Sequence, residues 1–135
     1  MATLREILRL SSDADAVWDA VRDIGALHRR LVPGFVTDAR LEDGARIVTF
    51  ANGITTREEI VSVDDAARRL VYAIPRGRFV HYQATVEVQD VGVGARLVWT
   101  IDLLPDEFSD AVRVMMRQGA DAICATFQGE RESRP

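Results

Sequence analysis

Six strand-like segments follow one another between residues 35 and 103, with turn residues and no helical pattern between them. Parallel strands need long crossover connections, so these segments are expected to pair antiparallel through short turns. Asn52 and Gly53 predict a two-residue hairpin between the second and third segments. A further strand is expected ahead of them, over Thr3–Leu10. The six segments are Phe35–Leu41, Arg46–Ala51, Ile54–Val63, Arg69–Ile74, Phe79–Gln89 and Ala95–Leu103.

A single long helix is expected after the strands, from Pro105 to Gln128. Its apolar residues recur at steps of three and four, which is the spacing of one helical face. Pro105 suits the first helical position, and Gly129 suits a stop just past the last one. The apolar face comprises Phe108, Val112, Met115, Met116, Gly119, Ile123 and Phe127.

The last two strand segments alternate apolar and polar residues, so one face of the sheet needs a cover. The long helix can supply it, because about 24 residues at ~1.5 Å rise extend roughly 36 Å. Two shorter helices are expected between the first strand and the others. Asp13 or Ser12 can cap a helix over Ala14–Arg22, and Asp23 can cap a second over Ile24–Leu31.

Length and composition indicate one domain over residues 1–135, with an ordered core over about residues 3–129. The net charge of −4 and the dispersed basic residues argue against nucleic-acid binding. No apolar stretch approaches the ~20 residues of a membrane span, and the N-terminus lacks the apolar region of a signal peptide. A soluble, cytoplasmic protein is therefore expected, either a monomer or a homodimer.

The sequence offers few groups that could hold a metal or cofactor. Cys124 is the only cysteine, which excludes an intrachain disulfide and predicts a buried structural thiol. The two histidines are far apart, and neither a phosphate-binding glycine loop nor a Gly-x-Ser-x-Gly elbow is present. No cofactor and no metal are expected.

The order of elements and several local motifs resemble the helix-grip fold of the START and Bet v 1-like (SRPBCC) superfamily, in particular its polyketide cyclase/dehydrase-like branch. The resemblance extends from Arg5 to Phe127. It implies an α+β fold in which a curved seven-stranded antiparallel sheet wraps the C-terminal helix and leaves an apolar cavity between them. Relatives cyclise polyketides, carry lipids or hormones, or act as protein adaptors, so the fold leaves the activity open. The motifs are Ala16–Asp23, Leu27–Leu31, Pro33–Phe35, Thr56–Asp64 and Arg69–Tyr72.

The cavity that the resemblance implies would be lined from both sides. Met115 and Met116 are flexible side chains that suit either a ligand cavity or an irregular core. Tyr82 shares a strand face with apolar residues, so it is expected to point inward and His81 outward. The predicted ligand-binding residues are Tyr82, Trp99, Phe108, Val112, Met115, Met116, Gly119 and Ile123.

Three residues are candidates for acid or base chemistry: Glu58, Tyr82 and His28. A carboxylate buried in the cavity could act as a base or proton donor, although a solvated ladder of Thr, Arg and Glu explains the same strand. His28 would lie near the cavity mouth or on an exposed helix surface. Three functions follow, with binding of a small lipophilic or aromatic molecule favoured. A cofactor-free cyclase, aromatase or dehydratase and a co-chaperone-like interaction module are the alternatives.

Overall fold

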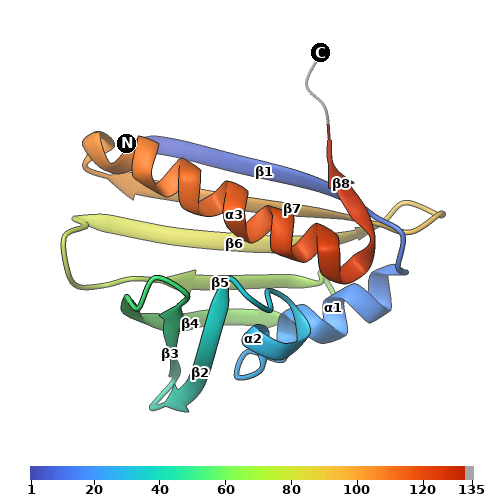
Figure 1. The fold of residues 1–135 in the computed structure, drawn as a ribbon, viewed down its shortest axis with the longest axis horizontal. Coiled ribbons are helices and arrows are strands. Elements are labelled where there is room, and N and C mark those ends of the chain that lie inside the picture. The colour runs from blue at the N-terminus through green and yellow to red at the C-terminus, as the bar shows by residue number, and fades with distance from the viewer. Residues whose placement is uncertain (133–135) are drawn as a thin grey trace.

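Residues 1–132 are described by a computed structural model in which one long helix lies against one antiparallel sheet (Figure 1). The sheet order is β2-β3-β4-β5-β6-β7-β1-β8. The strands are β1 (Ala2–Leu10), β2 (Val36–Glu42), β3 (Ala45–Phe50), β4 (Thr55–Asp64), β5 (Arg69–Ala73), β6 (His81–Asp90), β7 (Ala95–Leu104) and β8 (Gly129–Arg131). The helices are α1 (Ala14–Arg22), α2 (Leu27–Arg30) and α3 (Ser109–Phe127), with a 3-10 turn η1 (Asp106–Phe108) before α3.

This arrangement confirms the predicted α+β helix-grip fold, with eight strands instead of seven. The additional strand, β8, returns from α3 and pairs with Leu8–Leu10 at the end of β1. Gly129 opens this strand rather than ending the helix, because Gln128 adopts the left-handed conformation (φ 53°) that stops α3. A Cβ atom on Gly129 would clash with the Arg9 carbonyl oxygen, so the close approach of β8 to β1 requires glycine.

The predicted start of the long helix is also displaced. Pro105 is extended, and the Phe108 amide donates to its carbonyl oxygen at 3.3 Å, which forms the single 3-10 turn. The α-helix itself begins at Ser109. The chain therefore turns tightly between β7 and α3 before the regular helix starts.

Both short helices form, one as predicted and one shorter. The Asp13 carboxylate accepts from the Ala16 amide at 2.8 Å and caps α1. Asp23 instead accepts from Arg30 Nη1 at 3.0 Å, and its carbonyl closes a turn with the Ala26 amide. Because the Asp23 side chain is bound elsewhere, the predicted helix over Ile24–Leu31 is reduced to the four residues of α2.

The Asn52-Gly53 pair forms the turn between β3 and β4, but the loop is longer than the predicted two residues. The Phe50 amide bonds to the Ile54 carbonyl at 2.9 Å, leaving four residues from 51 to 54 outside the strands. Gly53 takes φ 88° and Asn52 Oδ1 accepts from the Ile54 amide at 3.0 Å.

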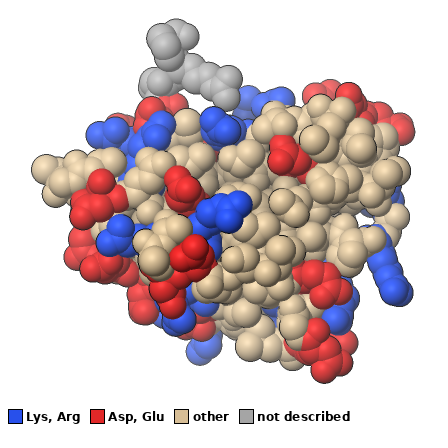
Figure 2. Space-filling view, turned by 180° about the vertical axis from the view of Figure 1, so that it is seen from behind, with Lys and Arg blue, Asp and Glu red and all other residues tan. Residues whose placement is uncertain are grey.

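The core lies between α3 and the face of the sheet that points toward it. Along β6 and β7, alternate residues are buried, with Tyr82 inside and His81 exposed, as predicted. The opposite face carries interspersed acidic and basic side chains (Figure 2). Within residues 1–132, no helix is both long enough and apolar enough to span a membrane.

Candidate functional site

A cavity of about 520 Å³ lies between the inner face of the sheet and α3. This volume falls in the range of ~300 to 1,000 Å³ that is typical of small-molecule sites. Strands β2 to β7 supply one wall, α3 supplies the other, and Leu27 of α2 and Leu31 just after it close one end. Ile54 and Val114 also line the cavity and are 52% and 56% exposed, so they mark its opening to solvent.

The structure brings most of the predicted ligand-binding residues to this cavity. Tyr82, Trp99, Phe108, Val112, Met115 and Ile123 all line it.

Met116 and Gly119 share the helix face but do not line the cavity wall. Met116 is fully buried in the core. Gly119 lies behind Trp99: a Cβ atom there would come within 2.9 Å of Trp99 Cζ3 and 3.2 Å of Phe35 Cε2. Its absent side chain therefore decides where two cavity-lining rings can lie.

A buried ion pair forms the polar part of the cavity wall. Arg46 of β3 and Glu58 of β4 are directly opposite in the antiparallel register, and Arg46 Nε donates to Glu58 Oε1 at 2.7 Å. Their exposed fractions are only 3% and 6%. The Arg46 guanidinium also stacks 4.9 Å from the centre of the Tyr72 ring. Glu58 is thus an inward residue, whereas its neighbours Arg57 and Glu59 pair with each other on the outer face.

Two buried tyrosines lie beside this ion pair. Burial raises the pKa of Tyr72 above its usual value, and the nearby Glu58 carboxylate raises it further. Burial likewise raises the pKa of Tyr82 well above its usual value, with smaller contributions from Tyr72 and Glu58. Both phenols are therefore neutral hydroxyl groups at physiological pH.

Two buried hydrogen-bond donors close to the ion pair and Tyr72 have no hydrogen-bond partner among residues 1–132. They are Arg46 Nη1 and Trp99 Nε1. The Trp99 indole is near enough to Tyr72 to lower the pKa of that hydroxyl slightly, yet its N–H does not reach hydrogen-bond geometry with it. His28 Nδ1 is likewise buried and has no hydrogen-bond partner among residues 1–132, but His28 does not line the cavity. Of the three catalytic candidates, Glu58 and Tyr82 therefore come together and His28 does not.

Sequence reasoning missed Arg46, which is the partner that accounts for the burial of Glu58. The available signal was strand alternation, because Arg46 must share a face with the apolar residue Val48. Phe35 and Phe79 were also missed, since both follow loop residues and carry no periodic pattern.

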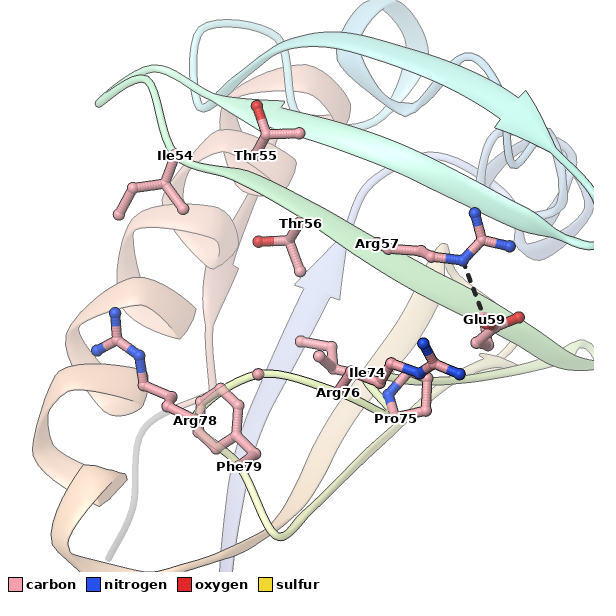
Figure 3. A pocket seen from close by; sticks show the side chains of 11 residues that line it. Ile54, Thr55, Thr56, Arg57, Glu59, Ile74, Pro75, Arg76, Arg78 and Phe79 are labelled. Atoms are coloured by element: carbon pink, nitrogen blue, oxygen red, sulfur yellow. Dashed lines mark hydrogen bonds and ion pairs between the residues drawn. The ribbon is translucent and has the colours of Figure 1, made fainter.

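A second hollow of about 540 Å³ adjoins the cavity where β4 and β5 separate. Pairing between these strands ends at Glu59 and Ala73, and the chain beyond them diverges. Figure 3 shows the gap, with Arg57 and Glu59 on one side, Arg76 and Arg78 on the other, and α3 behind. The hollow shares Ile54, Thr56, Ile74, Arg78 and Phe79 with the cavity.

Within residues 1–132, no three His, Cys, Asp or Glu side chains are arranged to hold a metal ion. Cys124 is half-buried on α3, and this burial raises the pKa of its thiol. The cavity is thus a mainly apolar chamber. Its buried polar groups come from Arg46, Glu58, Tyr72, Tyr82 and the Trp99 indole, and further polar side chains line it at Asn52, Thr56, Arg78 and Gln118.

Comparisons with known proteins agree with this geometry. A family model described as polyketide cyclase/dehydrase and lipid transport matches residues 2–128. An uncharacterised protein from Bacillus thuringiensis has a TM-score of 0.83 at 17% identity, over 94% of this chain and 99% of that one. A START superfamily protein from Mycobacterium smegmatis has a TM-score of 0.77 at 9% identity, over 93% and 97% of the two chains.

A biosynthetic protein is also similar in fold. The di-domain ARO/CYC protein BexL of the BE-7585A pathway has a TM-score of 0.80 at 16% identity, over 95% of this chain and 47% of its own. At these identities the similarity concerns the fold. No curated protein sequence matches the chain.

Proposed function

Given that this chain belongs to the polyketide cyclase/dehydrase and lipid transport family, we propose that it binds a small lipophilic or aromatic molecule between α3 and the sheet. The observation that carries the proposal is the cavity of about 520 Å³, which is lined mainly by aliphatic and aromatic side chains and opens to solvent. Apolar surface transferred from water into such a cavity contributes about 25 cal/mol per Å² before the costs of association.

The helix wall is suited to ligands of differing shape. Phe108, Val112 and Met115 face the cavity from α3 and the turn before it, and the unbranched Met115 side chain can adjust its rotamer. On the sheet wall, Trp99 and Tyr82 offer flat ring surfaces against which an aromatic molecule can stack.

Native mass spectrometry of the protein as purified, followed by denaturation, tests the proposal by identifying any retained small molecule. A panel of lipophilic and aromatic compounds should then raise the melting temperature, because a ligand that binds only the folded state stabilises it.

Two variants on α3 separate cavity binding from surface binding. Met115→Trp places bulk in the cavity and should abolish the ligand-induced rise in melting temperature. Arg117→Trp places the same side chain at an exposed position outside the cavity and should preserve it. If no compound stabilises the parent protein, or if Met115→Trp responds as the parent does, the binding proposal is wrong.

The alternative is a cofactor-free cyclase, aromatase or dehydratase acting in the same cavity, which the presence of Glu58 and Tyr82 there favours. In that case Glu58→Gln, which keeps an acceptor for Arg46, should abolish turnover while preserving binding. The third possibility, an interaction module, called for a filled cavity, and the open chamber gives it no support. The cytoplasmic location and the monomeric or dimeric state remain predictions.

A further inference from the structure

Two buried donors in the cavity have no hydrogen-bond partner among residues 1–132. Arg46 Nη1 and Trp99 Nε1, here called the donor pair, belong to side chains that are 3% and 7% exposed and that both line the cavity. A buried N–H without an acceptor is unfavourable, and folded proteins contain few of them. In the free protein, water molecules that enter the cavity can accept hydrogen bonds from these two N–H groups.

Both members of the donor pair belong to side chains that lie next to Tyr72 on the sheet wall. The Arg46 guanidinium stacks on Tyr72, and the Trp99 indole lies close to the same tyrosine. The cavity opening, marked by the exposed side chains of Ile54 and Val114, is formed by other elements, the β3–β4 loop and α3. A ligand with one polar end would therefore place that end against the donor pair and its apolar part against α3 and the opening.

Resting on the binding function proposed above, we infer that the ligand carries an uncharged acceptor oxygen, a ketone or a hydroxyl group, which is bound by Arg46 Nη1 and Trp99 Nε1.

The surroundings of the donor pair favour a neutral oxygen over a carboxylate. The charge of Arg46 is already balanced by Glu58 at 2.7 Å, so an entering anion would add an uncompensated negative charge in a buried place. The environment already opposes negative charge there, because burial and the Glu58 carboxylate both raise the pKa values of Tyr72 and Tyr82. A ketone needs no counter-charge and accepts two hydrogen bonds.

Three naphthalene probes of similar size separate these cases: 2-acetylnaphthalene, 2-ethylnaphthalene and 2-naphthoate. Their affinities are measured by isothermal titration calorimetry. The ketone should bind about tenfold or more tightly than the hydrocarbon, because one hydrogen bond to a charged donor is sufficient for that ratio. The naphthoate should bind less tightly than the ketone.

The indole N–H signals report the contact directly. The chain has two tryptophans, so the ¹H–¹⁵N spectrum of labelled protein contains two indole cross-peaks. The Trp18 indole donates to Asp65 at 2.9 Å and lies outside the cavity, so it serves as an internal control. Bound ketone should shift the Trp99 proton downfield and leave Trp18 in place.

A matched pair of variants completes the test. Trp99→Phe removes the indole donor and should reduce the preference for ketone over hydrocarbon, whereas Trp18→Phe should retain it. Equal binding of the two neutral probes, tightest binding of the naphthoate, or an unmoved Trp99 signal with ketone bound would each overturn the oxygen-anchoring inference while leaving the binding function intact. Failure of all three probes to bind would instead contradict the proposed binding function.

Discussion

Replacing Arg46 or Glu58 alone should destabilise the protein far more than replacing both. Arg46→Met leaves the Glu58 carboxylate buried without its cation, and Glu58→Met leaves the Arg46 guanidinium without its anion. Loss of one partner from a buried pair typically costs about 3–5 kcal/mol of unfolding free energy. Against a total stability of about 5–15 kcal/mol, each single variant should be severely destabilised.

The double variant Arg46→Met/Glu58→Met should recover that loss. It removes both desolvated charges and the unpartnered Nη1 donor, and Met side chains can fill the vacated space. Replacement of a buried ion pair by apolar residues is often neutral or stabilising by about 1–4 kcal/mol. We therefore expect the double variant to be at least as stable as the parent, and to show a reduced preference for an oxygen-bearing ligand because only the Trp99 donor remains.

Chemical unfolding in urea, followed by tryptophan fluorescence, measures these free energies for all four proteins of the cycle. The same strand supplies a control. Arg57 and Glu59 pair at 3.2 Å on the outer face, where both side chains are 38% exposed, and Arg57→Met should therefore lower the unfolding free energy far less than either single change in the buried pair. Single Arg46 or Glu58 variants that behave like the Arg57 control would refute the burial argument.

Two pH-dependent predictions follow from other groups. Arg22 and Trp18 donate hydrogen bonds to Asp65 and lower the pKa of its carboxyl group from the ordinary 3.8. The ionised Asp65 therefore stabilises the fold fully above pH 3.8, and this stabilisation is lost as the pH falls through the lowered pKa of the folded state. Acid unfolding of Asp65→Asn should show this, because its stability difference from the parent should shrink below about pH 4. While the protein is folded, Tyr72 and Tyr82 should give no tyrosinate absorbance near the ordinary tyrosine pKa of 10.0. The free energy of unfolding should fall above that pH, because the phenols release their protons in the unfolded chain but not in the folded one. An ordinary titration of either phenol in the native protein would show that the cavity end is solvated.

The sequence by itself determined the features that depend on local periodicity. Alternation along β6 placed Tyr82 inside and His81 outside, and the Asp13 cap and apolar stripe of α1 predicted that helix within its observed bounds. These patterns are reliable because a strand and a helix have fixed side-chain periods, whatever lies around them. The order of elements, together with local motifs that resemble the START and Bet v 1-like superfamily, then predicted the helix-grip fold.

Only the tertiary structure decided which residues meet in the cavity walls. Arg46 faces Glu58 because the register of β3 and β4 places them opposite each other, and that register depends on the four-residue loop between the strands. The need for glycine at position 119 likewise follows from the packing of α3 on Trp99, and at position 129 from the pairing of β8 with β1. Such contacts join residues distant in sequence, so their geometry follows from how the sheet and helix pack, which no local pattern encodes.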